Sequence, residues 1–207
     1  MSIERGFLLI LSGPSGVGKS TLSRDLRSRF PRAQLSISVT TRAPRSGEQE
    51  GVHYYFVDLE EFNRRLAEHE FLEWAEVFGN RYGTSRLVVE KMLTEGAVVL
   101  LDIDWQGARQ VRQLFAKLDV VSVFIAPPSL SSLQQRLMER GDDPQVYQSR
   151  MTKAKDEISH WQEYDYFILN DDLEKAKEDL AAILRTEELR RERVVVSKQQ
   201  VLVDMGS

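Results

Sequence analysis

The chain of 207 residues contains no cysteine. Disulfide bonds, thiolate metal sites and cysteine nucleophiles are therefore excluded. Histidine is scarce as well, occurring only at His53, His69 and His160, which show neither ligand spacing nor a neighbouring carboxylate pattern. We interpret all three as structural residues and predict no zinc site.

Long apolar segments are lacking near the N-terminus, where only five apolar residues, Phe7–Leu11, follow one another. This run is too short for the core of a signal peptide or for a membrane span, which predicts a cytoplasmic protein without a membrane partner. The net charge of −4 gives no broad basic surface, so a nucleic-acid partner is not expected. Local arginine clusters still permit a small anionic substrate. The sequence leaves the formation of a homo-oligomer open.

A glycine-rich segment, Gly13–Ser20, matches the pattern G-x-x-x-x-G-K-[ST] between the apolar run and a helical stretch at Thr21–Leu26. In that context the backbone N–H groups and the helix N-terminus can surround phosphates, whereas a bare turn would not need the lysine and hydroxyl. Lys19 can reach the β- and γ-phosphates, and Ser20 can ligate Mg²⁺. The predicted ATP-binding residues are Gly13, Pro14, Ser15, Gly16, Val17, Gly18, Lys19, Ser20 and Thr21.

The rest of the chain alternates apolar runs with helical patterns. Continuous apolar runs at Ala97–Leu101, Val120–Ala126 and Tyr166–Leu169 predict strands buried in a parallel sheet. Helices are expected between them, including one from about Gly107 to Leu118 and a final one with an apolar stripe from Leu173 to Leu184. This order predicts an α/β fold with a doubly wound sheet.

Residues 37–92 interrupt that order. Alternation predicts strands at Leu35–Thr40 and Val52–Val57, and Asn80–Thr84 has the composition of a turn. Between them, Asp58 begins a helix whose buried stripe would be Leu59, Phe62 and Leu66. We interpret 37–92 as an inserted substrate-binding lobe. Residues 127–156 are charged and helical, with predicted helices ending near Gly141 and restarting at Asp142–Pro144, which suits a mobile lid.

Two arginines, Arg42 and Arg45, flank Pro44 in one polar loop. Because proline stiffens the segment, both guanidinium groups could converge on one phosphate, with Tyr54 and Tyr82 as phenol donors. The alternative is that these arginines are solvated surface charges. The phosphate-binding loop upstream favours the phosphate interpretation.

An acidic residue, Glu73, stands between Leu72 and Trp74. A carboxylate in such an apolar setting needs donors. Guanine offers N1–H and the N2 amino group side by side, whereas adenine lacks this pair, so the carboxylate could discriminate between the bases. The alternative is a surface position on a strand.

Further charged residues follow the predicted strands and helices. Asp102 and Asp104 close a buried strand, where an acidic side chain can hold Mg²⁺ through water. The alternative is that Asp102 caps the next helix. Arg136 and Arg140 share one helix face, and Arg150 lies on the next helix. These arginines could close over transferring phosphates, or they could be solvated.

Taken together, these residues resemble guanylate kinase. The segments that carry the resemblance are Gly13–Ser20, Ser38–Arg45, Tyr54, Phe71–Trp74, Gly79–Thr84, Leu101–Gly107 in the family's bacterial form, and Tyr166–Asp171. The resemblance implies a P-loop kinase fold with a core at 1–36, 93–126 and 157–207, a GMP-binding lobe at 37–92 and a helical lid at 127–156. It also implies the reaction ATP + GMP ⇌ ADP + GDP with Mg²⁺.

The resemblance assigns a role to each matching position. Guanine would be recognised by Ser38, Glu73, Thr84 and Asp104, and the GMP phosphate by Arg42, Arg45, Tyr54 and Tyr82. Lys19, Arg136, Arg140 and Arg150 would stabilise the transferring group, while Ser20 and Asp102 would serve the metal. The two alternative functions are a P-loop kinase for another phosphorylated acceptor and a non-catalytic domain of this type that binds proteins. The intact loop argues against the second, and Glu73 against the first.

Overall fold

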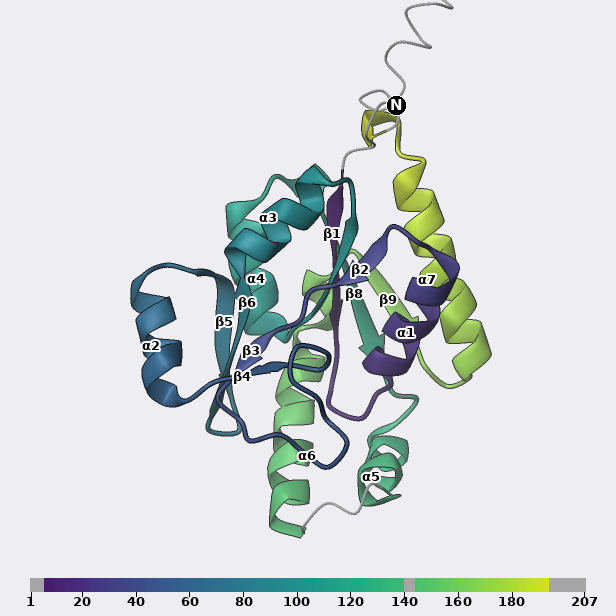
Figure 1. Cartoon of the computed structure of the whole chain (residues 1–207). Coiled ribbons are helices and arrows are strands. Elements are labelled where there is room, and N and C mark those ends of the chain that lie inside the picture. Colours follow the sequence, from purple (N-terminus) through teal and green to yellow (C-terminus); the bar gives the residue numbers. More distant parts are fainter. Residues whose placement is uncertain (1–5, 140–143, 194–207) are drawn as a thin grey trace, which may run out of the picture.

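A computed structural model describes residues 6–139 and 144–193 (Figure 1). Its main sheet is parallel and five-stranded, with the order β2-β7-β1-β8-β9. The strands are β1 (Phe7–Ser12), β2 (Ala33–Leu35), β7 (Val98–Asp102), β8 (Val120–Ala126) and β9 (Tyr166–Leu169). The predicted α/β fold with a parallel sheet is confirmed.

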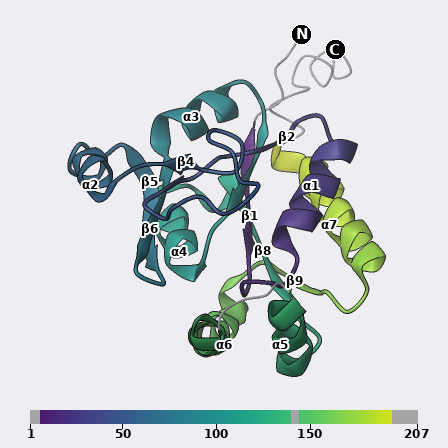
Figure 2. The ribbon, with the colours of Figure 1, turned by 60° about the horizontal axis from the view of Figure 1, so that its bottom comes forward.

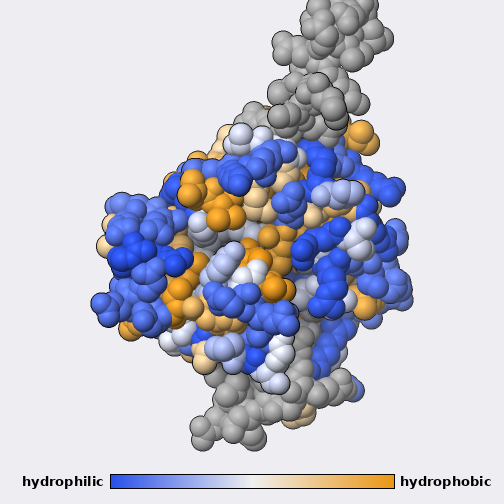
Figure 3. All heavy atoms as spheres, viewed as in Figure 1, coloured by the Kyte–Doolittle hydropathy of each residue, from blue (hydrophilic) through white to orange (hydrophobic). Residues whose placement is uncertain are grey.

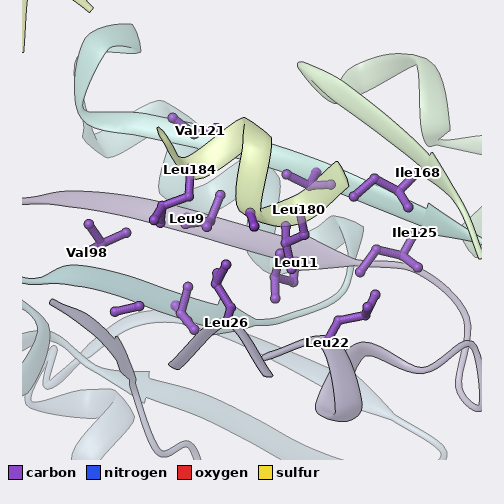
Figure 4. Packing of buried hydrophobic residues seen from close by; sticks show 14 of the residues in the cluster. Leu9, Leu11, Leu22, Leu26, Val98, Val121, Ile125, Ile168, Leu180 and Leu184 are labelled. Atoms are coloured by element: carbon purple, nitrogen blue, oxygen red, sulfur yellow. The ribbon is translucent and has the colours of Figure 1, made fainter. Parts of the chain in front are cut away.

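Helices cover both faces of this sheet (Figures 1 and 2). On one face, α1 (Lys19–Arg29) and α7 (Leu173–Glu188) bury leucines against β1, as in Figure 4. On the other face, α3 (Arg86–Thr94) and α4 (Trp105–Leu114) enclose a second cluster that includes Leu72 and Val111. The central strand β1 is therefore buried on both sides, which explains its unbroken apolar sequence.

A second sheet of four strands has the order β4-β3-β6-β5. Its members are β3 (Val39–Thr40), β4 (Tyr55–Phe56), β5 (Phe71–Val77) and β6 (Asn80–Ser85), and α2 (Leu59–Ala67) packs beside it. The outer face of α2 is hydrophilic and lies at the left edge of Figure 3. All of these elements fall within 37–92, although the division of the chain into core, lobe and lid stays a prediction.

Three predictions in this region were wrong. Leu35–Thr40 is not one strand, because the chain passes from one sheet to the other within it. The last contact with the main sheet is the hydrogen bond from the Ser36 N–H to the Leu100 carbonyl, at 3.0 Å, and Val39–Thr40 belongs to the second sheet. Within Val52–Val57 only Tyr55–Phe56 is strand, since the preceding residues form turns. Asn80–Thr84 is strand rather than turn, paired with β5 through a reversal at Phe78–Gly79.

Several helix and burial predictions also need correction. α4 begins and ends earlier than Gly107–Leu118, and a short 3-10 helix, η1 (Lys117–Asp119), follows it. Leu59 is the first residue of α2 and is 52% exposed, although Phe62, one turn further along the helix, is fully buried. β9 is an edge strand, so its Phe167 is half exposed although Ile168 is buried.

Two helices, α5 (Leu130–Glu139) and α6 (Pro144–Ser159), project together at the end of the sheet where β1 leads into the glycine-rich loop (Figure 2). Leu133, Leu137 and Ala154 form a small core between them. A second 3-10 helix, η2 (Trp161–Glu163), connects α6 to β9. The predicted helix end near Gly141, the start at Asp142 and the C-terminal tail lie outside the described residues.

Candidate active site

A cavity of about 270 Å³ opens at the carboxyl ends of β1 and β7. It is lined by the glycine-rich loop, by the second sheet and by α6, which are far apart in the sequence. The predicted site residues on its wall are Gly13, Ser15, Gly16, Gly18, Lys19, Ser20, Thr21, Ser38, Arg42, Arg45, Tyr54, Glu73, Tyr82, Asp102, Asp104 and Arg150. The fold thus brings most of the predicted residues to one place.

The glycine-rich loop depends on Gly13. Its φ is +142°, and an added Cβ would lie 2.1 Å from the Ile125 carbonyl oxygen on β8. The Gly13 carbonyl in turn accepts a 2.5 Å hydrogen bond from Lys19 Nζ, which lies 3.8 Å from Asp102. The first N–H groups of α1 have no intrahelical acceptor. The loop therefore directs backbone N–H donors and the Lys19 ammonium group toward the same place, where an anion can bind.

Replacing Gly13 by alanine should therefore lower the free energy of unfolding by at least about 2 kcal/mol, because the methyl group meets backbone rather than a movable side chain. Urea denaturation monitored by circular dichroism measures this change. Gly47→Ala is a matched control, since Gly47 has φ +84° but nothing within 4 Å of its added Cβ. Equal losses in the two variants would contradict the steric explanation.

Across the cavity, the two arginines of the polar loop are organised by Glu48. Its carboxylate binds the Arg42 guanidinium at 2.8 Å and accepts from the Arg45 N–H at 2.7 Å. The Arg42 guanidinium lies over the Tyr54 ring, and Tyr54 meets Tyr82 edge-on. Burial raises the pKa of Tyr54 to about 12, so its phenol stays protonated and can donate to an anion.

Glu73 is buried on β5 with 4% of its surface exposed, which excludes the surface alternative. Its Oε1 accepts a 2.5 Å hydrogen bond from the Thr84 hydroxyl on β6. Burial raises the pKa of Glu73 to about 7, against the opposing effect of the Thr84 hydrogen bond and with a further increase from the charge of Asp104. The site holds a carboxylate that has few donors of its own and faces a cavity.

The two aspartates after β7 have different surroundings. Asp104 caps α4, because its Oδ1 accepts from the N–H groups of Gln106 and Gly107, and its Oδ2 lies 3.4 Å from Lys153 Nζ. The capping role considered for Asp102 thus belongs to Asp104. The Asp102 side chain is 34% exposed and faces the cavity beside Lys19.

Asp102 and Ser20 offer Mg²⁺ a carboxylate and a hydroxyl oxygen on one cavity wall. Among residues 6–139 and 144–193, no group of three or more histidine, cysteine or acidic side chains could enclose a metal ion. A pair of protein oxygens from Asp102 and Ser20 fits Mg²⁺, which commonly takes one or two protein oxygens as ligands and completes its coordination shell with phosphates and water.

The predicted lid arginines are placed differently from one another. Arg150 is buried and lines the cavity. Arg136 instead donates to the backbone carbonyls of Asn170 and Val17 and is not part of the cavity wall. Pro14, Val17 and Thr84 also lie off the cavity wall. Arg140 lies outside the described residues.

Sequence reasoning missed Glu157 on α6. It lines the cavity, is 9% exposed, and its Oε2 has no hydrogen-bond partner. Burial raises its pKa to about 7, although Lys19 and Lys153 oppose this. A signal existed, since Glu157 follows the buried Ala154 by three residues and therefore lies on the same helix face.

A phosphate-binding loop after the central strand, facing arginines and a buried carboxylate across one cavity, defines a nucleotide-binding kinase of the P-loop class. A family model described as guanylate kinase matches residues 5–187. The chain belongs to the guanylate kinase family. Among the described residues, no helix combines the length and apolarity that a membrane crossing requires.

Individual relatives support this assignment. The chain is 52% identical over 189 residues to the guanylate kinase of Maricaulis maris, covering 91% of this chain and 86% of the relative. It is 49% identical over 203 residues to that of Shewanella oneidensis, covering 97% of each. The structure is similar to guanylate kinase from Anaplasma phagocytophilum, with a TM-score of 0.79, 41% identity and coverage of 93% of this chain and 92% of that one.

Proposed function

We propose that this kinase transfers the γ-phosphoryl group of ATP to GMP, giving ADP and GDP. The observation that carries the proposal is the buried Glu73 carboxylate, which shares one cavity with the phosphate-binding loop and with Arg42 and Arg45. The names of the relatives support it. We place the core at 1–36, 93–126 and 157–207, the GMP-binding lobe at 37–92 and the lid at 127–156. The partners would be ATP and GMP in the cytoplasm.

ATP would bind with its phosphates against Gly13–Thr21. The loop donates backbone N–H groups, and Lys19 would exchange its present acceptor, the Gly13 carbonyl, for the β- and γ-phosphates. Ser20 and Asp102 would hold Mg²⁺, which neutralises phosphate charge when bound. Arg150 would approach the transferring group from α6, and Arg136 would support the loop from behind, with Arg140 assisting from the lid.

GMP would bind against the second sheet. Arg42, Arg45, Tyr54 and Tyr82 would hold its phosphate, because they converge on the cavity and the phenols can donate. Ionised Glu73 would accept from N1–H and the N2 amino group of guanine. Ser38, Thr84 and Asp104 would complete the base site, and Thr84 would act through its hydrogen bond to Glu73.

The chemical step would need no general base, because a GMP phosphate oxygen is already ionised at neutral pH. A bond forms between that oxygen and the γ-phosphorus, the bond from the γ-phosphorus to the β–γ bridging oxygen breaks, and ADP leaves with the electron pair. The protein would contribute alignment and charge stabilisation. Closure of α5 and α6 over the cavity would exclude water, which otherwise competes as acceptor.

A coupled assay of ADP release tests the proposal with GMP, dGMP, AMP, CMP and UMP as acceptors. We expect guanine nucleotides to exceed the others in kcat/KM by at least about 10³-fold, since a buried carboxylate without its donors costs several kcal/mol. Preference for another acceptor would support a different P-loop kinase. No acceptor-dependent ADP release with any nucleotide would support the non-catalytic alternative.

A further inference from the structure

The strand that carries Glu73 has an unusual neighbour on its open side. β5 is the last strand of the second sheet, so within the part of the chain that the structure describes only β6 pairs with it along the ladder. An edge strand leaves alternate N–H and C=O groups without ladder partners. At Trp74, the residue directly after Glu73, both groups are bound by a side chain of α4.

That side chain is Gln110. Its Oε1 accepts from the Trp74 N–H at 3.1 Å, and its Nε2 donates to the Trp74 carbonyl at 2.7 Å. One amide thus binds the strand as the backbone of another strand would. The bonds matter at this point because the pairing of β5 with β6 is irregular between Phe71 and Glu73, and a bulge redirects side chains while weakening the ladder that holds them.

The same helix also touches the Glu73 carboxylate directly. Gly107 stands one turn before Gln110, and a Cβ added to it would lie 2.2 Å from Glu73 Oε2. The absence of a side chain therefore lets the carboxylate lie against the helix backbone. α4 itself is fixed at its start by the Asp104 cap and along its length by Ala108 and Val111, which are buried in one cluster with Leu72.

We propose that Gln110 is a positioning residue for base selection, which sets the direction of the Glu73 carboxylate through the Trp74 backbone while Gly107 leaves the space that the carboxylate needs. This inference rests on the proposed function, because it concerns how Glu73 meets guanine. The hydrogen bonds of Gln110 join it to the backbone of Trp74 and Gln106, and Gln110 itself is not part of the cavity wall, so its effect should be confined to the acceptor nucleotide.

The test compares Gln110→Leu with Gln113→Leu, an exposed glutamine on the same helix. Gln110→Leu removes both hydrogen bonds at similar side-chain volume. We expect an increase of about 10-fold in KM for GMP and a similar fall in the GMP-to-AMP ratio of kcat/KM, as two lost hydrogen bonds allow. KM for ATP should stay within about 2-fold, because the ATP site lacks these contacts. Gln113→Leu should match the wild type.

Two more variants keep the test decisive. Gln110→Glu retains the acceptor for the Trp74 N–H but places a carboxylate oxygen against the Trp74 carbonyl, and should lower the GMP-to-AMP ratio at least as much as Gln110→Leu. Gly107→Ala improves helix propensity but displaces the carboxylate, so it should lower the GMP-to-AMP ratio without changing KM for ATP. If Gln110→Leu does not fold, the results for these two variants decide.

Unchanged GMP kinetics in Gln110→Leu and Gly107→Ala would overturn the inference. Equal changes in KM for ATP and for GMP would also overturn it, because they would indicate a general structural role. Absence of GMP-dependent ADP release in the wild type would instead contradict the proposed function. The two failures are therefore distinguishable within one set of assays.

Discussion

Replacing Lys19 by alanine should leave the chain folded and reduce kcat by about 10³-fold, the scale on which a preorganised charge at a transferring group acts. In the structure Lys19 Nζ lies between the Gly13 carbonyl and Asp102, at 2.5 Å and 3.8 Å. It is therefore held at the mouth of the loop before any phosphate binds. Its removal takes away the cation that would neutralise charge as the phosphoryl group moves between the two nucleotides.

Steady-state ADP release measures kcat, and thermal denaturation shows whether the variant is folded. Lys91→Ala is the control, because Lys91 lies on α3 with 74% of its side chain exposed and away from the cavity. A Lys19→Ala enzyme that retains a tenth or more of wild-type turnover would exclude a catalytic role for the lysine. A variant that unfolds would show up in the melting curve rather than be mistaken for a catalytic defect.

Replacing Glu73 by glutamine should remove the preference for guanine. A carboxylate has two acceptor oxygens, whereas the glutamine amide has one, and its NH₂ group would face one of the two guanine donors. The GMP-to-AMP ratio of kcat/KM should therefore fall by at least about 10²-fold. In the wild type, KM for GMP should rise as the pH falls through about 7, because burial raises the pKa of Glu73 to about 7 and the protonated acid is a poorer acceptor. Glu73→Gln should lack this pH dependence.

The same substitution should stabilise the nucleotide-free protein. Because the pKa of Glu73 is raised from 4.5 to about 7, the folded state binds its proton more tightly than the unfolded state does. Stability from this group is fully present below pH 4.5 and is lost as the pH rises to about 7. At pH 8 the variant should exceed the wild type by up to about 3 kcal/mol. Urea denaturation at pH 4 and pH 8 measures the difference, and equal stabilities at pH 8 would contradict a buried, ionised Glu73.

The sequence was sufficient for the parts of the site that have a local signature. The loop Gly13–Ser20 carries its own pattern, and the apolar runs at β7 and β8 predict strands buried on both faces, as the structure has them. The sequence also assigns Arg42, Arg45 and Glu73 to the same site as this loop. Two arginines beside one proline suit a phosphate ligand, and a carboxylate in an apolar segment needs hydrogen-bond donors. These inferences depend on residue type and spacing, which the chain displays directly.

Other features depend on tertiary pairing and could not be predicted from local pattern. Asn80–Thr84 has the composition of a turn, yet it lies in strand β6 because β5 and β3 supply partners on both sides. Asp102 and Asp104 are equivalent in the sequence, and only the start of α4 at Trp105 decides which of them caps it. The importance of Gln110 is equally invisible until β5 lies beside α4.

The glycine-rich loop also has a consequence for how the chain is made. The Val17 carbonyl at its centre accepts a 2.7 Å hydrogen bond from the Asn170 side chain, and β1 lies between β7 and β8 in the main sheet. Both β8 and Asn170 must therefore be synthesised before the loop has its full support. The loop is synthesised long before these partners, so nascent chains that end before β9 should not retain ATP.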